Sequence, residues 1–215
     1  VNTLSLRPKM NRFIANRNVY QRYNVSAAFV VKKKFADDGA EGLAFVHAKG
    51  NDTMDTIHQS IRNQVMSCRS GGSDRTSDSM DILTRMPRFL SRFLIDIIRF
   101  LDKHGWCPNF LISNDPYYSS VVLSNVGSIK LKCGYHHLTN WGTNSVFCLI
   151  GEKKKTPVFN QEDGSCTMRE TVDLGLTIDE RLADGYYYSK SIRLLKHLLE
   201  HPELLDLPIN EEVDY

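Results

Sequence analysis

Residues 176–185 read LTIDERLADG. The stretch before them, Thr167–Ile178, is predicted to be a long strand that follows the turn residue Gly164. The stretch after them, Asp184–His201, carries apolar side chains on one face and stops at Pro202, as expected of a helix. The apolar face is predicted to hold Tyr188, Ile192, Leu195, Leu198 and Leu199. Residues 176–185 therefore join the last long strand to the last helix.

The first third of the sequence predicts a hairpin and then a helix. Tyr20–Phe35 has the composition of a strand, Asp37–Gly39 that of a turn, and Leu43–His47 that of the returning strand. From Thr53 on, apolar residues recur four apart, which is the spacing of one helical face. They are Ile57, Ile61 and Val65. Asp52 or Thr53 is the expected cap at the start of this helix.

A second helix is predicted from Met80 to His104, with a kink at Pro87. Its polar residues recur three or four apart and leave one polar stripe on an otherwise apolar helix. They are Arg88, Arg92, Asp96, Arg99 and Asp102. So wide an apolar surface has to be covered, by the chain's own sheet in the commoner case or by a partner subunit. The most apolar stretch, Phe89–Leu101, is interrupted by charges and is shorter than the about 20 apolar residues that cross a bilayer, so no membrane span is expected.

Shorter stretches complete the predicted main sheet. Ser119–Ser124, Ile129–Cys133 and Val146–Ile150 have the composition of strands and are separated by glycines. Residues 70–79, rich in Gly, Ser and Asp, are expected to form a flexible connection, and the acidic tail 210–215 is expected to be loose. We expect residues 1–215 to form a single domain, a length that one large domain accommodates.

Composition limits the classes of function. Hydrophobic residues make up 41% and charged residues 24%, which is ordinary for a globular protein. A net charge of +2 gives no reason to expect a nucleic-acid or membrane partner. The five cysteines show no closely spaced pair, so neither a metal site nor a disulfide framework is predicted. Residues 1–17 lack a signal-peptide pattern, and a cytoplasmic location is the simpler expectation.

Four motifs give the sequence its resemblance to a known family. The segment DERLADG, residues 179–185, resembles the Asp-His-Arg-x-x-Asp-Gly signature of the dihydrolipoyl acyltransferase catalytic domain, whose core is shared with chloramphenicol acetyltransferase. PKMN at residues 8–11, VVLSNVG at 121–127 and LLKHLLEHPELL at 194–205 resemble further family motifs. All four occur in the family's order, so the resemblance covers nearly the whole chain. It extends to stand-alone bacterial proteins that are similar to this domain.

The resemblance implies an architecture and an assembly. It implies an α/β fold of the chloramphenicol acetyltransferase type, a mixed β-sheet backed by helices in two layers. It also implies a cytoplasmic homotrimer with active sites at its subunit interfaces, with further assembly possible in the family. The family's first strand and helix are expected before Pro8, where this sequence has few residues. No lipoyl attachment hairpin is recognisable in the sequence.

The resemblance also assigns site residues. In the family, a histidine takes the proton from the thiol of coenzyme A or dihydrolipoamide, and a serine from the neighbouring subunit stabilises the oxyanion. Ser124 occupies the serine position and Asp184 the aspartate position, where the family residue mainly holds the loop. Glu180 occupies the histidine position. The residue on which the family's chemistry depends is therefore different in this sequence.

A glutamate changes the expected chemistry. Imidazole, with a reference pKa of about 6.5, can take a proton from a thiol near about 8.5, whereas a solvated carboxylate near about 4.3 is a weaker base. Its negative charge also opposes a developing thiolate and oxyanion. Loss of a general base commonly costs about 100- to 10,000-fold in rate. Ordinary thiol acyl transfer is expected to be weak or absent, unless burial at an interface raises the carboxylate's basicity or another histidine serves.

The adjacent pair His136 and His137 offers that other histidine. It lies in the segment YHHLTNWG, residues 135–142, after the strand that carries Ser124. A structural or interface role is the more common fate of such a pair, a catalytic role is the alternative, and no carboxylate or cysteine at ligand spacing favours a metal. The lysines at 32–34 and 153–155 either meet the phosphates of coenzyme A or are solvated strand ends, which is the commoner case.

Two functions remain open on the sequence. One is a coenzyme A-dependent acyltransferase that uses Glu180 and Ser124, supported by the four motifs. The other is a catalytically inactive trimeric scaffold or ligand-binding subunit, supported by the glutamate and by the wide apolar helix. The acyl group and the acceptor are not indicated by any motif.

Overall fold

A mixed five-stranded sheet forms the centre of the molecule. The computed structural model describes residues 1–33, 41–70, 85–112 and 115–215. The strand order is β4-β3-β5-β6-β7. The bounds are β3 (Val25–Lys32), β4 (Glu41–Ala48), β5 (Val121–Asn125), β6 (Val146–Phe159) and β7 (Cys166–Ile178). The pairs β3–β5 and β5–β6 are parallel and the outer pairs are antiparallel, which confirms the expected mixed sheet.

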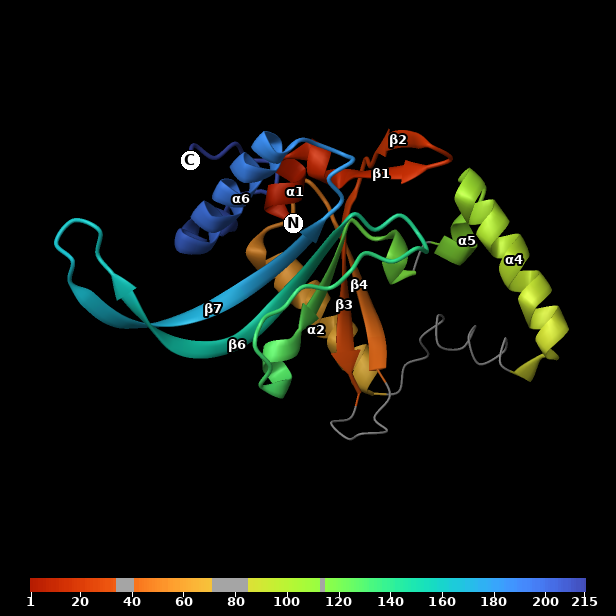
Figure 1. Ribbon diagram of the computed structural model, residues 1–215, viewed down its shortest axis with the longest axis horizontal. Coiled ribbons are helices and arrows are strands. Elements are labelled where there is room, and N and C mark those ends of the chain that lie inside the picture. Colours follow the sequence, from red (N-terminus) through yellow and green to blue (C-terminus); the bar gives the residue numbers. More distant parts are fainter. Residues whose placement is uncertain (34–40, 71–84, 113–114) are drawn as a thin grey trace.

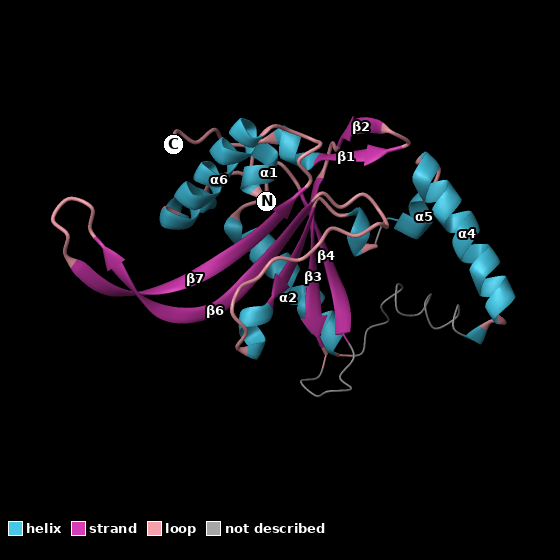
Figure 2. Cartoon of the chain, in the orientation of Figure 1, coloured by secondary structure: helices cyan, strands magenta, loops and turns pink. Residues whose placement is uncertain are grey.

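Helices pack on one face of this sheet. The main core cluster joins Ala27 and Val121 of the sheet to Leu4 of α1 (Asn2–Leu6) and Tyr188 of α6 (Gly185–Glu200). On the same face of β3, Val31 packs with Cys68 of α2 (Met54–Arg69). Figure 1 shows α1, α2 and α6 beside the strands, and Figure 2 shows the same layers by element type. The expected two-layer arrangement is confirmed.

The opposite face of the sheet is covered by a loop segment. Ala28, Val122, Phe147 and Leu149 point to this face, since side chains alternate along a strand. Cys133 and Leu138, from the segment between β5 and β6, pack against them. Short 3-10 helices are formed by Pro8–Asn11, Pro116–Tyr118 and Pro202–Asp206.

The single strand predicted for residues 20–35 is two strands. β1 (Arg12–Ala15) and β2 (Asn18–Gln21) form a separate hairpin, and β3 begins only at Val25. Asn16 and Arg17 both have positive φ, 47° and 63°, which is the backbone of the tight type I′ turn. Residues Arg22–Asn24 interrupt the predicted strand and carry the chain from one sheet to the other. The predicted return strand 43–47 is confirmed within β4, which pairs with β3.

The strand predicted at Ile129–Cys133 is wrong. Residues Val126–Ile129 form a 3-10 turn, capped by Asn125, whose side chain accepts a hydrogen bond from Ser128 N. Lys130 then has φ 60°, which turns the chain away from the strand direction. Asn125 and the turn after it satisfy part of the backbone locally, and Leu131 O accepts one hydrogen bond from Glu152 N of β6 without forming a strand. The strands predicted near 119–124, 146–150 and 167–178 are confirmed as β5, β6 and β7.

The predicted helices are confirmed with changed details. α2 begins after Thr53, which donates its backbone N–H to Thr56 Oγ1. α4 (Arg88–His104) begins directly after Pro87, and residues 80–84 of the helix predicted from Met80 lie outside the described residues. A short helix, α5 (Asn109–Ile112), follows. No helix in the described ranges has the length and apolar character needed to cross a membrane.

The buried face of α6 differs from the predicted one. Tyr188, Ser191, Leu194 and Leu198 are buried, whereas Ile192 and Leu199 are exposed. The small polar Ser191 lies at this face because its hydroxyl donates to Tyr187 O and accepts from Arg7 Nε. The predicted turn at residues 37–39 and most of the predicted connection at 70–79 lie outside the described residues.

Candidate active site

The loop between β7 and α6 is fixed at its first residue. Asp179 N donates to Ser145 O at 3.0 Å, and Tyr188 Oη donates to Asp179 O at 2.6 Å. Burial raises the pKa of Tyr188 to about 12, with the nearby Asp179 charge acting in the same direction, so its hydroxyl stays a donor at neutral pH. Leu182 is buried and anchors the other side of the loop. The loop backbone is therefore held from both the sheet and the helix.

An ion pair closes the same loop. Arg181 Nε and Nη2 donate to Asp179 Oδ1 and Oδ2 at 2.8 and 2.6 Å, a bidentate arrangement. The hydrogen bonds from Arg181 hold the pKa of Asp179 below its ordinary value. Sequence reasoning did not single out this pair, although the Asp-x-Arg spacing in DERLADG was its signal. The pair brackets Glu180, which is exposed.

Asp184 ends the loop as a helix cap. Its Oδ1 accepts a hydrogen bond from Tyr187 N at 2.7 Å, and α6 begins at the next residue. A carboxylate at this position satisfies a free backbone N–H and faces the positive end of the helix dipole. The geometry gives Asp184 a structural task.

Ser124 lies far from Glu180 within one chain. Ser124 on β5 pairs in register with Leu149 on β6, and Leu149 pairs in register with Gly175 on β7. Ile178 is three residues beyond Gly175, about 10 Å along the strand, and Glu180 lies further on. Two strand spacings, together about 10 Å, also separate β5 from β7. The structure therefore does not bring Ser124 and Glu180 together in a single copy.

Ser124 shares its face of the sheet with the histidine pair. It alternates with Val122, so its side chain points away from the helices. His136 stacks on Phe147, with ring centroids 4.3 Å apart and planes at 11°, and its ring lies 4.7 Å from that of His137. Phe147 is diagonal to Ser124 across β5 and β6. Both histidines are exposed, and their Nδ1 atoms lie next to backbone carbonyls, His136 Nδ1 at 2.6 Å from His137 O.

A cleft opens beside β3 and β4, on the opposite side of the sheet order from β7 and the Glu180 loop. Its volume is about 380 Å³. Arg22 reaches into it and donates to Tyr118 O at 2.9 Å and to Thr143 O at 2.6 Å, and burial lowers the pKa of Arg22 to about 10. Tyr118 Oη donates to Asp102 Oδ1 at 2.5 Å. Sequence reasoning missed these groups, because they come from segments far apart in the chain.

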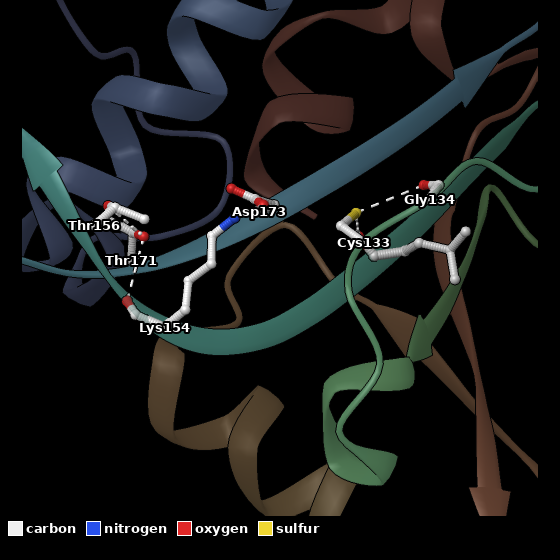
Figure 3. Close-up of polar contacts among 7 residues, drawn as sticks. Cys133, Gly134, Lys154, Thr156, Thr171 and Asp173 are labelled. Atoms are coloured by element: carbon white, nitrogen blue, oxygen red, sulfur yellow. Dashed lines mark hydrogen bonds and ion pairs between the residues drawn. The ribbon is translucent and has the colours of Figure 1, made fainter.

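Two of the three lysines of β6 form ion pairs within their own hairpin. Lys154 forms an ion pair with Asp173 and Lys153 with Glu170, both from β7. Figure 3 shows Lys154 reaching toward Asp173 across the two strands, with Thr156 opposite Thr171. Beyond Ile150 the two strands continue as a long arm. The lysines at 153–155 thus lie inside the strand and not at its end.

Figure 3 also shows how the segment that carries the histidines is tied to the sheet. Cys133 Sγ lies 3.6 Å from Gly134 O and 3.5 Å from Leu149 O. Gly175 passes so close to Gly134 O that a side chain at this position would collide with it. These contacts fix where the segment crosses β6 and β7.

The sequence matches a family model over part of its length. Residues 111–207 match the 2-oxoacid dehydrogenases acyltransferase (catalytic domain). The matched region contains Ser124, both histidines, Glu180 and Asp184, and it begins after α4. No curated protein matches the sequence significantly.

Solved structures of the same kind share the fold. A probable dihydrolipoamide acetyltransferase of Listeria monocytogenes is 15% identical, with 99% of this chain and 68% of that chain covered and a TM-score of 0.61. The cubic core of a pyruvate dehydrogenase multienzyme complex is 13% identical, with 95% and 66% covered and a TM-score of 0.61. A dihydrolipoamide acetyltransferase of Azotobacter vinelandii is 12% identical over the same shares, also with a TM-score of 0.61. The chain therefore spans about two thirds of the length of these structures and has their fold.

Proposed function

We propose that this protein is an acyltransferase that works on an acyl thioester of coenzyme A, with a site formed by Glu180 of one copy and Ser124 of the next in a homotrimer. One observation carries the proposal. The loop that presents Glu180 is held rigidly, yet Glu180 is exposed and far from Ser124 within its own chain. A rigid exposed loop of this kind is suited to complete a site on a neighbouring copy.

The face that carries Ser124 supports the same assembly. It lies opposite the helices, and its covering segment leaves His136 and His137 exposed beside it. The dihydrolipoamide acetyltransferase of Azotobacter vinelandii was studied for the catalytic roles of a serine, a histidine and an asparagine. In the present chain the corresponding residues by motif are Ser124, Glu180 and Asp184. The proposal assigns the first two to chemistry and the third to holding the loop.

The reaction balances with these two groups. The Glu180 carboxylate takes the proton of the acceptor's hydroxyl, amine or thiol as that atom attacks the thioester carbonyl. The hydroxyl of Ser124 donates a hydrogen bond to the oxyanion of the tetrahedral intermediate. The carbon–sulfur bond then breaks, the acyl group stays on the acceptor, and the proton passes from Glu180 to the departing sulfur. Enclosure between two copies would raise the basicity of the carboxylate that this scheme requires.

An inactive trimeric scaffold or ligand-binding subunit is the second candidate. It is favoured by the exposure of Glu180 in one copy, since a solvated carboxylate is a weak base and its charge opposes a developing thiolate. The two candidates differ in what Glu180→Gln does. The substitution lowers turnover in an enzyme, whereas it leaves a scaffold's assembly and ligand binding unchanged.

The test combines binding and turnover on the full chain. Calorimetric titration with coenzyme A and acetyl-coenzyme A is followed by release of free thiol in the presence of a panel of alcohols, amines and thiols. Saturable binding with turnover that depends on Ser124 and Glu180 supports the enzyme. Binding without turnover in any acceptor supports the ligand-binding subunit. If the chain shows no binding of coenzyme A and no turnover, the proposal is removed.

A further inference from the structure

Helix α4 stands at the periphery of the molecule. Figure 1 shows it apart from the central sheet, with its last turns nearest to the body. Its described contacts with the body come from those turns. Asn16 N donates to Lys103 O, Tyr118 Oη donates to Asp102, and Cys107 Sγ approaches Ile98 O. The first two turns of the helix, residues 88–94, project beyond these contacts.

The apolar surface of α4 is exposed to solvent. Phe89, Phe93, Ile97 and Phe100 recur at helical spacing and form one stripe. Phe89 is 76%, Phe93 64% and Phe100 54% exposed, and Trp106, just after the helix, is 62% exposed. The expectation that the chain's own sheet covers this helix is wrong. A stripe of aromatic side chains this large marks an interaction surface in a folded protein.

Basic side chains line the apolar stripe. Arg88, Arg92, Arg99 and Lys103 recur at the same helical spacing and form a second stripe beside the first. Of the two acids in the helix, Asp102 is engaged by Tyr118 and by the N–H of Gly142, which leaves Asp96 among the cations. The helix therefore presents an aromatic and aliphatic surface next to an excess of positive charge.

This combination selects one kind of partner. An excess of positive charge along an apolar stripe requires a partner that is rich in negative charge and also accepts apolar side chains. A bilayer with anionic headgroups supplies both requirements at once. The apolar side chains of such a helix are buried about 5–10 Å deep, at the boundary between headgroups and acyl chains. The aliphatic parts of Arg and Lys side chains lie along the apolar stripe, while their charged ends contact the lipid phosphates.

We propose that α4 docks the protein on the surface of a membrane that contains anionic lipid, with the helix lying in the plane of the interface and the stripe of Phe89, Phe93, Ile97 and Phe100 buried in it. This inference goes beyond the acyltransferase proposal and is independent of it. It concerns a helix that precedes the residues matched by the family model. Each Arg or Lys near the anionic surface is attracted to it, so the four cations strengthen a binding that salt weakens.

Flotation with lipid vesicles tests the docking. The full chain is mixed with vesicles of phosphatidylcholine and with vesicles in which part of that lipid is replaced by phosphatidylglycerol. We expect flotation with the anionic vesicles, a strong loss at high salt, and a blue shift of the Trp106 fluorescence that disappears in Trp106→Phe. Failure to float with either vesicle overturns the proposal.

Matched variants separate the helix from other apolar surface. Phe93→Asp on α4 is compared with Phe159→Asp on the β6–β7 arm, because Phe93 and Phe159 are exposed to nearly the same extent, 64% and 62%. We expect flotation to be lost only in Phe93→Asp, and to fall about tenfold or more in the double variant Arg88→Glu with Arg92→Glu. Equal flotation of Phe93→Asp and the unmodified chain overturns the proposal.

The competing occupant is a second copy of the chain. It is recognised by the mass in solution without lipid, measured by light scattering. A smaller assembly in Phe93→Asp, together with unchanged flotation, would show that the stripe lies between copies and would overturn the membrane proposal. An unchanged mass with lost flotation supports it.

Discussion

The side chain of Arg181 donates two hydrogen bonds, of 2.8 and 2.6 Å, to the carboxylate of Asp179, and only Glu180 separates the two residues in the sequence. The carbonyl of Asp179 is held in turn by the hydroxyl of Tyr188. The position that the proposed chemistry requires is thus defined by its two neighbours in sequence and by one residue of the following helix. Glu180 itself needs no other contact within the chain to be placed.

The pair makes part of the stability depend on pH. Because Arg181 lowers the pKa of Asp179 in the fold, the pair stabilises the fold above the unfolded pKa of about 3.9, and this stability is lost as pH falls through the folded pKa. We expect Arg181→Gln to lower the free energy of unfolding by about 1 kcal/mol at neutral pH and by less in acid. Urea unfolding across a pH series measures this difference.

The control for this prediction is Arg193→Gln on α6, where the arginine contacts the Ser189 hydroxyl at 3.3 Å. It should show little loss at any pH. If Arg181→Gln lowers the free energy of unfolding as much at a pH below the folded pKa of Asp179 as at neutral pH, the assigned role of the ion pair is contradicted.

The core under α6 can be tested at two leucines five residues apart. Leu194 is 1% exposed and Leu199 is 55% exposed. We expect Leu194→Ala to cost about 2–5 kcal/mol of unfolding free energy, through lost burial and the cavity left behind, and Leu199→Ala less than about 0.5 kcal/mol. Chemical unfolding of both variants decides this. Similar costs at the two positions would place the buried face of the helix elsewhere.

The sequence correctly predicted the helices and strands that depend on local residue patterns. The β3–β4 hairpin, β7, α2 and α6 follow from alternation, helical spacing and caps, and the motif DERLADG correctly placed the loop between β7 and α6. The strand predicted at 129–133 failed, because the cap by Asn125 and the turn at Lys130 outweigh apolar composition. Local turn chemistry is the competing influence there.

Long-range placement was not available from the sequence. Helical spacing showed that α4 has an apolar face, yet it does not show whether that face meets the sheet, and in the structure it does not. The separation of Ser124 from Glu180 depends on the register of β5, β6 and β7, which no motif encodes. The cleft at Arg22 joins residues from six separate stretches of the chain and has no local signal.

Ser124 should matter for chemistry and little for stability. Its hydroxyl is proposed to donate to the oxyanion, so Ser124→Ala is expected to lower kcat about 100- to 1,000-fold. Coenzyme A binding and the unfolding curve should remain close to those of the unmodified chain. Steady-state kinetics and calorimetry measure both, with Ser189→Ala, an exposed serine on α6, as the control. Equal activity of the two variants would remove Ser124 from the site.

Replacing Glu180 by histidine tests the assignment by motif. An imidazole is the better base toward a thiol and carries no negative charge when neutral. We expect Glu180→His to raise the rate of acyl transfer to thiol acceptors about 100-fold or more, with little change for the best alcohol or amine acceptor. The rates are compared over the same acceptor panel. A lower rate with thiols in Glu180→His would show that the position is not equivalent to the family's histidine.

The most direct measurement mixes two inactive proteins. Ser124→Ala and Glu180→Gln are unfolded together in equal amounts, refolded, and assayed for acyl transfer beside each variant refolded alone. If Glu180 of one copy and Ser124 of the next form the site, random assembly leaves about a quarter of the interfaces with both residues intact, and about a quarter of the original activity should return. Mixed assemblies that stay as inactive as the separate variants, although the unmodified chain refolds to full activity, would contradict a site shared between copies.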